Sequence, residues 1–376
     1  MTVQNVITRV GYWVIKSRLG QALFRRNPVG RYIVRRFGNL ARALPLSAPQ
    51  NVMIDICNAC NFRCTFCPTG DNDLLKSVGR PKGLMDFALF TKIIDDLKIF
   101  NGQITYISLH KDGEPLLNKK IGEMIAYAKA AKVASSIEVT SNASLLTHEM
   151  ATLLLDAGLD TIRVSVEHVS DQGYKNLVRT YSKYQQIVDN VANLYSERNR
   201  RKHKLRILVK ILDVGLSGEE KEKFRRDFNP ISDVARVENI MGWSHSEKKD
   251  FTLGLNPSVG MDGVTPLKKE RIVCPEPFKM LAINFNGSVS PCCDDWAHGL
   301  LVGNATTTPV GDIWNGRELS RVRQLHLSGR RGELPTCASC QYMQGVTDIF
   351  DLDDQRLALL RKYEALSIEP AETPAA

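Results

Sequence analysis

Long apolar runs are absent from this chain of 376 residues, and acidic residues are absent from its first 54 positions. No run reaches the roughly 18 apolar residues that a transmembrane helix needs, so no membrane-spanning helix is expected. Evenly spread cysteines are also lacking, because the nine cysteines stand in groups. Such grouping is typical of metal ligands in the reducing cytosol rather than of a disulfide framework. We therefore expect a cytoplasmic protein.

The lack of acidic residues at the start leaves a strongly basic arm. Residues 1–54 contain nine basic residues, and the remaining 322 residues carry 41 basic and 41 acidic ones, so the net charge of +9 lies entirely in the arm. Apolar residues recur there at helical spacing in two stretches. We expect residues 1–48 to form a basic amphipathic helical arm. It either packs on the rest of the protein or contacts an anionic membrane surface or substrate carrier.

Three cysteines, Cys60, Cys64 and Cys67, form a C-x3-C-x2-C pattern directly after a strand-like run at 51–56. Three thiolates within eight residues can bind three irons of a [4Fe-4S] cube and leave the fourth iron without a protein ligand. Cys57 stands three residues earlier and could close a four-cysteine zinc site or cluster. Spacing alone leaves both alternatives open.

This loop, with Phe66 before its third cysteine, resembles the loop of the radical S-adenosylmethionine (SAM) superfamily. The resemblance implies an α/β fold with a partial (β/α)6 TIM-like barrel, here over residues 49–245. It implies that SAM chelates the open iron and is reductively cleaved to a 5′-deoxyadenosyl radical, which abstracts a hydrogen atom from a C–H bond. A flavodoxin or ferredoxin-type protein would donate the electron.

Further short motifs follow in the order that the family has them. Gly113-Glu114-Pro115 resembles the turn that receives the SAM amino group, although Asp112 stands where the family often has a second glycine. Ser141-Asn142 resembles the end of the fourth strand, with Ala143 in place of a glycine, and residues 161–167 resemble the fifth strand. Taken singly, such residues are usually structural. The resemblance implies SAM or substrate contacts for Gly113, Glu114, Pro115, Ser141, Asn142, Ser165 and Glu167.

Helical stretches are expected at 87–100, 121–131, 149–157 and 184–198, between these strands. Residues 205–212 read as the sixth strand, with Lys210 directed into the barrel. The segment 246–271 is polar and rich in Gly, Lys and Asp, which is typical of a linker or lid. Residues 346–376 are expected to form a C-terminal helix and a disordered tail.

A second cysteine group resembles the SPASM auxiliary-cluster domain. Cys274, Gly287 and Cys292 are spaced C-x12-G-x4-C, and Asn-Gly at 286–287 predicts a hairpin turn. Cys337 and Cys340 follow as C-x2-C, and no cysteine comes later, unlike the full SPASM pattern. The resemblance implies the shortened twitch form, a small α+β domain of hairpin plus helix over residues 272–345. It implies one auxiliary [4Fe-4S] cluster, while a zinc ribbon is the alternative; the ligands would be Cys274, Cys292, Cys337 and Cys340.

Two cysteines remain outside both groups, Cys57 and Cys293. Free cysteines are usually small buried apolar residues. Epimerases of the radical SAM family, however, return a hydrogen atom from a thiol, and either residue is a candidate donor. Asp294, Asp295 and His298 are candidate proton acceptors or hydroxyl ligands, or else belong to a solvated turn.

We expect a radical SAM oxidoreductase or isomerase. Relatives with one auxiliary cluster act on sugars and aminocyclitols, so we favour dehydrogenation or epimerisation of a sugar, an aminocyclitol or a carrier-linked glycan. Peptide maturation is the alternative, although the arm is too short for a winged-helix leader-binding domain. A non-catalytic iron–sulfur or zinc scaffold is a more remote one. No nucleic-acid partner is expected.

Overall fold

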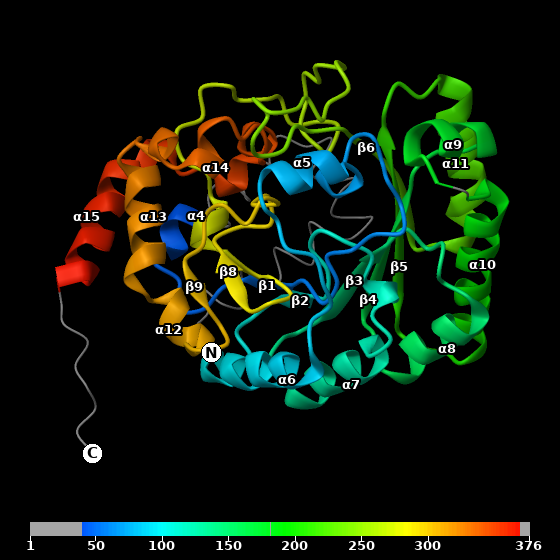
Figure 1. Ribbon diagram of the computed structural model, residues 1–376, viewed down its shortest axis with the longest axis horizontal. Helices are drawn as coiled ribbons and strands as arrows, with labels where there is room; N and C mark the ends of the chain where they lie inside the picture. Colours follow the sequence, from blue (N-terminus) through cyan, green and yellow to red (C-terminus); the bar gives the residue numbers. More distant parts are fainter. Residues whose placement is uncertain (1–39, 181, 369–376) are drawn as a thin grey trace.

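One nine-stranded sheet organises the residues that the computed structural model describes, 40–180 and 182–368 (Figure 1). Six parallel strands lie in the order β6-β5-β4-β3-β2-β1, and β7, β8 and β9 continue the sheet beyond β1. Parallel strands joined by helices form a barrel of the (β/α) type, here left open. The six strands are β1 Asn51–Ile54, β2 Tyr106–Ser108, β3 Ile137–Ser141, β4 Thr161–Val166, β5 Arg206–Asp213 and β6 Val234–Asn239.

Helices cover the outer side of this partial barrel and follow one another around the curved sheet (Figure 1). Val52, Ile107 and Ile162 of the strands are fully buried in the same apolar core as Ile93 and Leu154 of the helices. Because side chains alternate across a strand, the residues between them face the concave side, where polar groups gather. The helices are α6 Phe87–Asp96, α7 Ile121–Ala131, α8 His148–Asp156, α10 Tyr184–Arg200 and α11 Gly218–Phe228.

The four expected barrel helices are confirmed, with shifts of a residue or two at their ends. The stretch at 87–100 is divided between α6 and a 3-10 turn at 97–100. Capping explains where two of them begin: the Asp86 carboxylate accepts from the N–H of Ala88, and the Thr147 hydroxyl accepts from that of Met150. The sequence analysis did not predict the barrel helix α11 or two short helices, α5 Asn72–Ser77 and α9 Asp171–Val178.

The numbering of the strands expected from the sequence is wrong. Residues 137–141 form the third parallel strand rather than the fourth, 161–166 the fourth, and 206–213 the fifth. The sixth is β6, which the sequence analysis missed because Val-Ala-Arg-Val-Glu-Asn has few apolar residues. As the terminal strand of the sheet, β6 has only one neighbour, β5, so it needs less apolar side chain than a central strand.

The second cysteine group lies in a region that extends the barrel sheet. Strand β7, Met280–Ile283, pairs in parallel with β1, and β8, Ser288–Ser290, turns back antiparallel to β7. The predicted hairpin is therefore confirmed, and Gly287 at its turn has φ +85°, which favours glycine. Beyond the hairpin come β9 Gly303–Asn304, α12 Val310–Trp314, α13 Arg317–Leu327 and α14 Pro335–Ala338.

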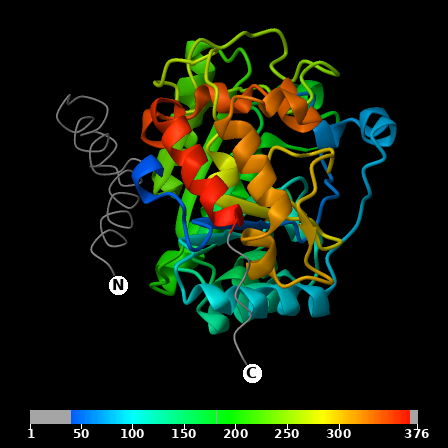
Figure 2. The same ribbon diagram turned by 90° about the vertical axis from the view of Figure 1, so that its left-hand side faces the viewer.

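The remaining segments pack around this frame. Residues 246–271 contain neither helix nor strand in the described structure, yet Phe251 is buried against Leu75 and Trp296. Helix α15, Arg356–Ile368, lies beside α13 (Figure 2). The expected arm falls outside the described residues up to position 39, and only α4, Leu40–Ala43, belongs to its C-terminal part. The tail from 369 also lies outside them. Within the described ranges, no helix has the length and hydropathy needed to cross a membrane.

Candidate active site

The first cysteine loop follows β1 and is held by backbone contacts. The N–H of Arg63 donates to the carbonyl oxygen of Val178 at 3.0 Å, which ties the loop to the end of α9. Position 70 requires glycine, because a Cβ atom there would lie 2.4 Å from the carbonyl oxygen of Cys64. Phe62 is buried in the main core and anchors the middle of the loop. The chain itself therefore fixes the loop backbone.

The three thiols of this loop fit a shared metal cluster. Burial raises the pKa of Cys60 to about 12 and that of Cys64 well above its ordinary value. Cys60 and Cys67 each raise the pKa of Cys64 further, so the three sulfur atoms lie near one another. Buried thiols that lie near one another ionise only beside positive charge, and iron supplies that charge. The donor set therefore matches three ligands of a [4Fe-4S] cluster.

The Gly113-Glu114-Pro115 turn lies against the start of the cysteine loop. A Cβ atom on Gly113 would lie 2.3 Å from the carbonyl oxygen of Cys57 and 2.4 Å from that of Ala59, so this close approach requires glycine. The N–H of Glu114 donates to the Ala59 oxygen at 2.8 Å. Pro115 begins the 3-10 helix η3, Pro115–Leu117. Burial raises the pKa of Glu114 to about 7, although its hydrogen bonds act in the opposite direction.

The end of β3 meets the same carboxylate. The Ser141 hydroxyl donates to Glu114 Oε1 and the Asn142 backbone N–H donates to Oε2, both at 2.8 Å. The Asn142 side-chain amide lies 4.0 Å from Cys60 Sγ. Ala143 has φ +59°, a left-handed conformation that an alanine adopts only with strain, which explains the glycine usual at this place in the family. Two sequence motifs therefore converge beside the first cysteine of the loop.

Ser165 and Glu167 complete the predicted SAM-contacting set. Ser165 lies opposite Lys210 in the β4–β5 register. Burial raises the pKa of Glu167 to about 7, while Lys210 lowers it and Glu114 raises it. Glu167 also raises the pKa of Cys64, so its carboxylate lies close to the loop. The structure thus brings the predicted motifs together at the carboxyl ends of parallel strands; their contacts with SAM stay a prediction.

The second cysteine group lines a cavity between the hairpin, α13 and α14, with about 410 Å³ of empty space that includes its opening to solvent. Burial raises the pKa of Cys292 well above its ordinary value, and Cys274 and Cys337 raise it further. The Cys340 thiol donates to the Asp294 carboxylate at 2.9 Å. Four converging thiols suit one cluster with full protein ligation or a structural zinc ion. The four predicted ligands all line this cavity: Cys274, Cys292, Cys337 and Cys340.

Cys57 and Cys293 belong to neither predicted ligand group, although Cys293 directly follows Cys292 and raises its pKa. The Cys57 thiol donates to the carbonyl oxygen of Ala59 at 3.3 Å, and burial raises its pKa to about 11. Burial also raises the pKa of Cys293, while Glu276 raises it and Lys279 lowers it. Cys293 is not among the described residues that line the 410 Å³ cavity. Both thiols are therefore protonated at neutral pH, the state that a hydrogen-atom donor requires.

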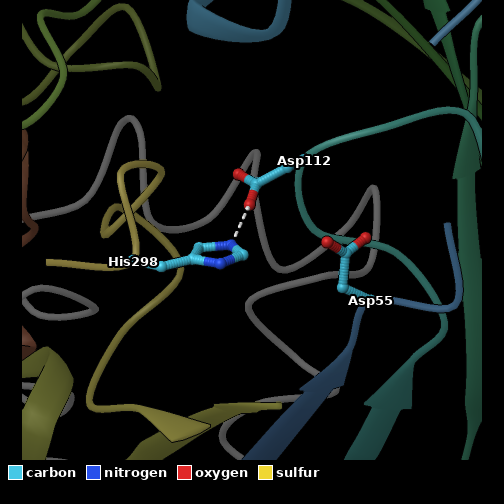
Figure 3. A group of neighbouring side chains, drawn as sticks. All are labelled: Asp55, Asp112 and His298. Carbon is cyan, nitrogen blue, oxygen red and sulfur yellow. Dashed lines mark ion pairs between the residues drawn. The ribbon is translucent and has the colours of Figure 1, made fainter. Parts of the chain in front are cut away.

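A buried charged cluster connects the barrel to the auxiliary region. Figure 3 shows Asp55 after β1, Asp112 after β2 and His298 after the hairpin, with their ligand-type atoms within 4.8 Å of one another. His298 Nε2 lies 3.5 Å from Asp112 Oδ2, and Lys111 and Arg80 lie 2.5 and 3.6 Å from the same oxygen. A further cation there would lie beside two positive side chains, which the Coulomb energy disfavours.

Asp55 is the unusual member of this cluster. Both its carboxylate oxygens are buried and lack a well-aligned hydrogen-bond donor in the described structure. Burial raises the pKa of Asp55 to about 7 and the Asp112 charge adds to this, while Lys111, Arg80 and the backbone N–H of Asp112 act in the opposite direction. Burial alone would raise the pKa of Asp112 too, but Lys111 and Arg80 hold it below its ordinary value. Sequence reasoning did not single out Asp55, although an acid directly after a buried strand was a usable signal.

Asp294 and Asp295 are buried, so their alternative placement in a solvated turn is wrong. The Asp295 carboxylate accepts hydrogen bonds from the Ser290 hydroxyl at 2.7 Å and the Thr336 hydroxyl at 3.1 Å, together with two backbone N–H groups. It therefore organises the loop after the hairpin. Asp294 differs, because burial raises its pKa to about 7 and its partner is Cys340.

A larger cavity of about 700 Å³ opens between the end of β6, the segment 246–271 and the auxiliary region. Its walls hold two ion pairs, Arg236 with Glu238 and Lys279 with Glu276 at 2.6 Å, and a further carboxylate, Asp262, which accepts hydrogen bonds from Val264 and Thr265. A second cavity of about 510 Å³ also has Arg236 in its wall and includes Lys210, as predicted for a residue directed into the barrel. Tyr342 lines both the 700 Å³ cavity and the four-cysteine cavity.

Profiles of two known protein families match the barrel and the auxiliary region separately. A profile of the radical SAM superfamily matches residues 54–230, and a profile of the SPASM iron–sulfur cluster-binding domain matches residues 274–341. The chain is 22% identical over 301 residues to the S-adenosyl-L-methionine-dependent 2-deoxy-scyllo-inosamine dehydrogenase of Niallia circulans. That alignment covers 79% of this chain and 94% of the relative.

Other relatives are similar over smaller parts or in fold alone. The GTP 3′,8-cyclase of Saccharophagus degradans is 31% identical over 130 residues, which are 34% of this chain and 36% of the cyclase. Among solved structures, SuiB of Streptococcus suis bound to its precursor peptide SuiA superimposes with a TM-score of 0.57 and 15% identity, covering 89% of this chain and 77% of SuiB. This likeness supports the partial barrel followed by an auxiliary domain.

Proposed function

Because the chain belongs to the radical SAM superfamily and carries a SPASM iron–sulfur domain, we propose that it dehydrogenates a carbinol carbon of a carbohydrate-type small molecule. Its cofactors are a SAM-binding [4Fe-4S] cluster, an auxiliary iron–sulfur cluster and SAM. When bound, the first cluster supplies the electron that cleaves SAM and generates the 5′-deoxyadenosyl radical. The outcome of the reaction then depends on how this chain binds SAM and the substrate.

The proposal of a carbohydrate-type substrate rests on the ion pairs that line the 700 Å³ cavity. Arg236 with Glu238, and Lys279 with Glu276, offer hydrogen-bond donors and acceptors without a large net charge. Such pairs suit the hydroxyl and amino groups of a sugar or aminocyclitol, and Phe350 adds an apolar wall. The dehydrogenase from Niallia circulans, which aligns over 94% of its length, is named for an aminocyclitol substrate.

The residues around Glu114 are proposed to hold SAM. The Glu114 carboxylate still has acceptor capacity after its three hydrogen bonds and suits the SAM ammonium. Gly113 and Pro115 shape the turn. Ser141 and Asn142 at the end of β3, and Ser165 and Glu167 at the end of β4, supply polar groups for the remaining SAM hydroxyls or for the substrate.

Dehydrogenation also releases a proton from the substrate hydroxyl, and Asp55 is the proposed acceptor. Its carboxylate is buried beside the Asp112 backbone, Lys111 and Arg80, and neither oxygen has a well-aligned hydrogen-bond donor among the described residues. It stands between the first cysteine loop and the auxiliary region, where a substrate radical must lie to lose its electron to the second cluster. The raised pKa of Asp55, about 7, suits a group that takes up a proton and returns it to solvent.

Epimerisation is the second candidate reaction, and the position of Cys293 supports it. Glu276 and Lys279, which line the 700 Å³ cavity, both influence the Cys293 thiol. A protonated thiol beside the substrate can return a hydrogen atom to the opposite face of a substrate radical. The charged neighbours of Cys57 are Asp55 and Glu114, and neither of them lines this cavity.

Two partners remain part of the proposal. A flavodoxin or ferredoxin-type protein is the proposed electron donor for the first cluster. The basic arm at 1–48 is proposed to contact an anionic membrane surface or substrate carrier from the cytoplasmic side, on the strength of its nine basic residues. Flotation of the full chain with anionic liposomes, compared with the chain lacking 1–48, tests the contact; equal flotation would refute it.

The decisive experiment uses anaerobically reconstituted protein with SAM, dithionite and a panel of aminocyclitols, sugars and sugar nucleotides. We expect 5′-deoxyadenosine in every reaction and a rise in its rate with the correct substrate, accompanied by a ketone product. An alcohol with inverted configuration at one carbon, formed in place of the ketone, would favour epimerisation. Failure to form any 5′-deoxyadenosine would refute the assignment of radical chemistry.

A further inference from the structure

His326 lies in the last turn of α13 and lines the same cavity as the four auxiliary cysteines. The side chain is 1% exposed to solvent. The sequence analysis did not single out this residue. Its hydrogen bonds show that packing is not the whole explanation.

The hydrogen bonds of His326 fix which ring nitrogen carries the proton. The backbone N–H of Cys274 donates to His326 Nδ1 at 3.3 Å. A nitrogen that accepts an N–H has no proton of its own, so the ring is neutral and its proton is on Nε2. Nε2 is buried and has no hydrogen-bond partner in the described structure. An N–H donor is therefore buried without an acceptor at the wall of a cavity of about 410 Å³.

We propose that the Nε2–H group of His326 donates a hydrogen bond to a sulfur atom of the auxiliary cluster. Buried donors without partners are rare in folded proteins, and the expected occupant of this cavity offers sulfide and thiolate acceptors. The bond would stabilise the extra negative charge of the reduced cluster, so His326 raises the reduction potential. Through Nδ1, the same ring holds the backbone of Cys274 in place.

The alternative role for a histidine in such a cavity is direct ligation of iron. A ligating Nε2 must present its lone pair, which would transfer the ring proton to Nδ1. Nδ1 would then face the N–H of Cys274 as a second donor, and the observed hydrogen bond would be lost. Four cysteines already supply a complete ligand set. His326 is therefore a positioning residue for the cluster rather than a ligand.

Two substitutions separate the functions of the two ring nitrogens. His326→Asn keeps an acceptor near the position of Nδ1 and removes the donor at Nε2, whereas His326→Gln keeps a donor near Nε2. The background is the full chain in which Cys60, Cys64 and Cys67 are replaced by Ala, so that the auxiliary cluster is the only one. His203 is the matched control, because its Nδ1 also accepts a backbone N–H, from Leu205 at 3.0 Å, but it does not line the cavity.

The measurement is a redox titration of the auxiliary cluster followed by electron paramagnetic resonance (EPR). We expect His326→Asn to shift the midpoint potential to a more negative value, while His326→Gln and His203→Asn stay near the parent. Iron content should be equal in all four proteins. An unchanged potential in His326→Asn, or an equal shift in His326→Gln, would overturn the proposal, and so would a loss of iron in both His326 variants.

A second measurement needs no substitution and therefore does not depend on folding of a variant. In the reduced wild-type holoprotein, pulsed EPR should show an exchangeable proton coupled to the auxiliary cluster, together with a weak coupling to ¹⁵N from labelled histidine. Exchange into D₂O should remove the proton coupling. A strong, directly bonded nitrogen coupling would identify a ligand, and no histidine coupling would refute the contact. Neither result depends on the proposed substrate.

Discussion

The Ser141 hydroxyl donates a hydrogen bond to the Glu114 carboxylate at 2.8 Å, which joins the end of β3 to the loop after β2. The backbone N–H of Asn142 donates to the other oxygen of the same carboxylate. The sequence presents two separate motifs that resemble SAM-contacting ones, whereas the structure shows that one motif positions the other. The geometry of the strand ends therefore depends on this carboxylate, which is also the proposed contact for the SAM ammonium.

Replacing Glu114 should weaken SAM binding. We expect Glu114→Gln to raise the dissociation constant about 10- to 100-fold, because a hydrogen bond between charged partners contributes about 1.5–3 kcal/mol. Ser141→Ala removes one of the three donors to the carboxylate and should have an effect of less than about tenfold. Calorimetry on the reconstituted holoprotein measures both, with thermal unfolding as the check on folding. Wild-type affinity in Glu114→Gln would contradict the assigned contact.

The affinity for SAM should also depend on pH. Burial raises the pKa of Glu114 to about 7, and only its ionised form attracts the SAM ammonium. Affinity should therefore rise as the pH approaches about 7 and then level off, with a loss of up to about tenfold for each unit below. Glu114→Gln should remove this dependence. Glu167→Gln is the matched control, since burial raises the pKa of Glu167 to a similar value; a loss of the slope in the Glu167 variant alone would assign it to that residue.

Replacing Asp55 should uncouple SAM cleavage from product formation. Asp55→Asn keeps the shape of the side chain but removes the proposed proton acceptor. We expect 5′-deoxyadenosine to form while the ratio of product to 5′-deoxyadenosine falls about 10²-fold or more, the usual contribution of a general base. Asp73→Asn, on the exposed side of α5, is the control. An unchanged ratio in Asp55→Asn would exclude this role.

The stability of the apoprotein gives an independent check on the same carboxyl group. Folding raises the pKa of Asp55 from 3.8 to about 7, so the folded state binds more protons in that interval. The contribution of Asp55 to the free energy of unfolding is therefore lost as the pH rises from about 4 to about 7. Urea unfolding at pH 5 and pH 8 should show a smaller decrease in Asp55→Asn than in the wild type. An equal decrease would mean that Asp55 is not buried as the structure places it.

The two spare thiols distinguish dehydrogenation from epimerisation. Cys293→Ala and Cys57→Ala should both leave ketone formation intact, because a dehydrogenase returns no hydrogen atom to its substrate. Iron content should stay at about eight per chain, the sum of two [4Fe-4S] clusters. Accumulation of an unquenched or over-oxidised product in Cys293→Ala alone would show instead that this thiol is the hydrogen donor of an epimerase.

The two ligand groups should be separable by metal analysis. Replacing Cys337 and Cys340 together by Ala should lower the iron content from about eight to about four per chain, and replacing Cys60, Cys64 and Cys67 should do the same. Only the first variant should still cleave SAM. Bound zinc in the wild type, with iron at about four, would instead support the zinc-ribbon alternative.

Local sequence was sufficient for much of this account. Cysteine spacing, the Gly113-Glu114-Pro115 turn and the Asn-Gly turn of the hairpin are short-range patterns, and the structure shows why glycine stands at 113 and at 287. Strand β6 was missed because only one neighbouring strand and few apolar residues define it.

Contacts between distant segments could not be predicted in the same way. Asp55, Asp112 and His298 meet only because β7 adds to the sheet beside β1 and carries the loop after the hairpin to the barrel mouth. His326 acquires its role from a hydrogen bond to Cys274, which lies on a different segment. Neither the tautomer of His326 nor the lack of a well-aligned donor for Asp55 leaves a mark in the sequence, because both depend on tertiary packing.

The most direct test of the proposed reaction is isotope transfer from the substrate. Aminocyclitols and sugars carrying deuterium at each carbinol carbon in turn are incubated with the reconstituted protein, SAM and dithionite, and 5′-deoxyadenosine is analysed by mass spectrometry. One labelled position should give singly deuterated 5′-deoxyadenosine together with a ketone at that carbon. Unlabelled 5′-deoxyadenosine from every carbohydrate, with transfer from a deuterated peptide instead, would contradict the proposed substrate class.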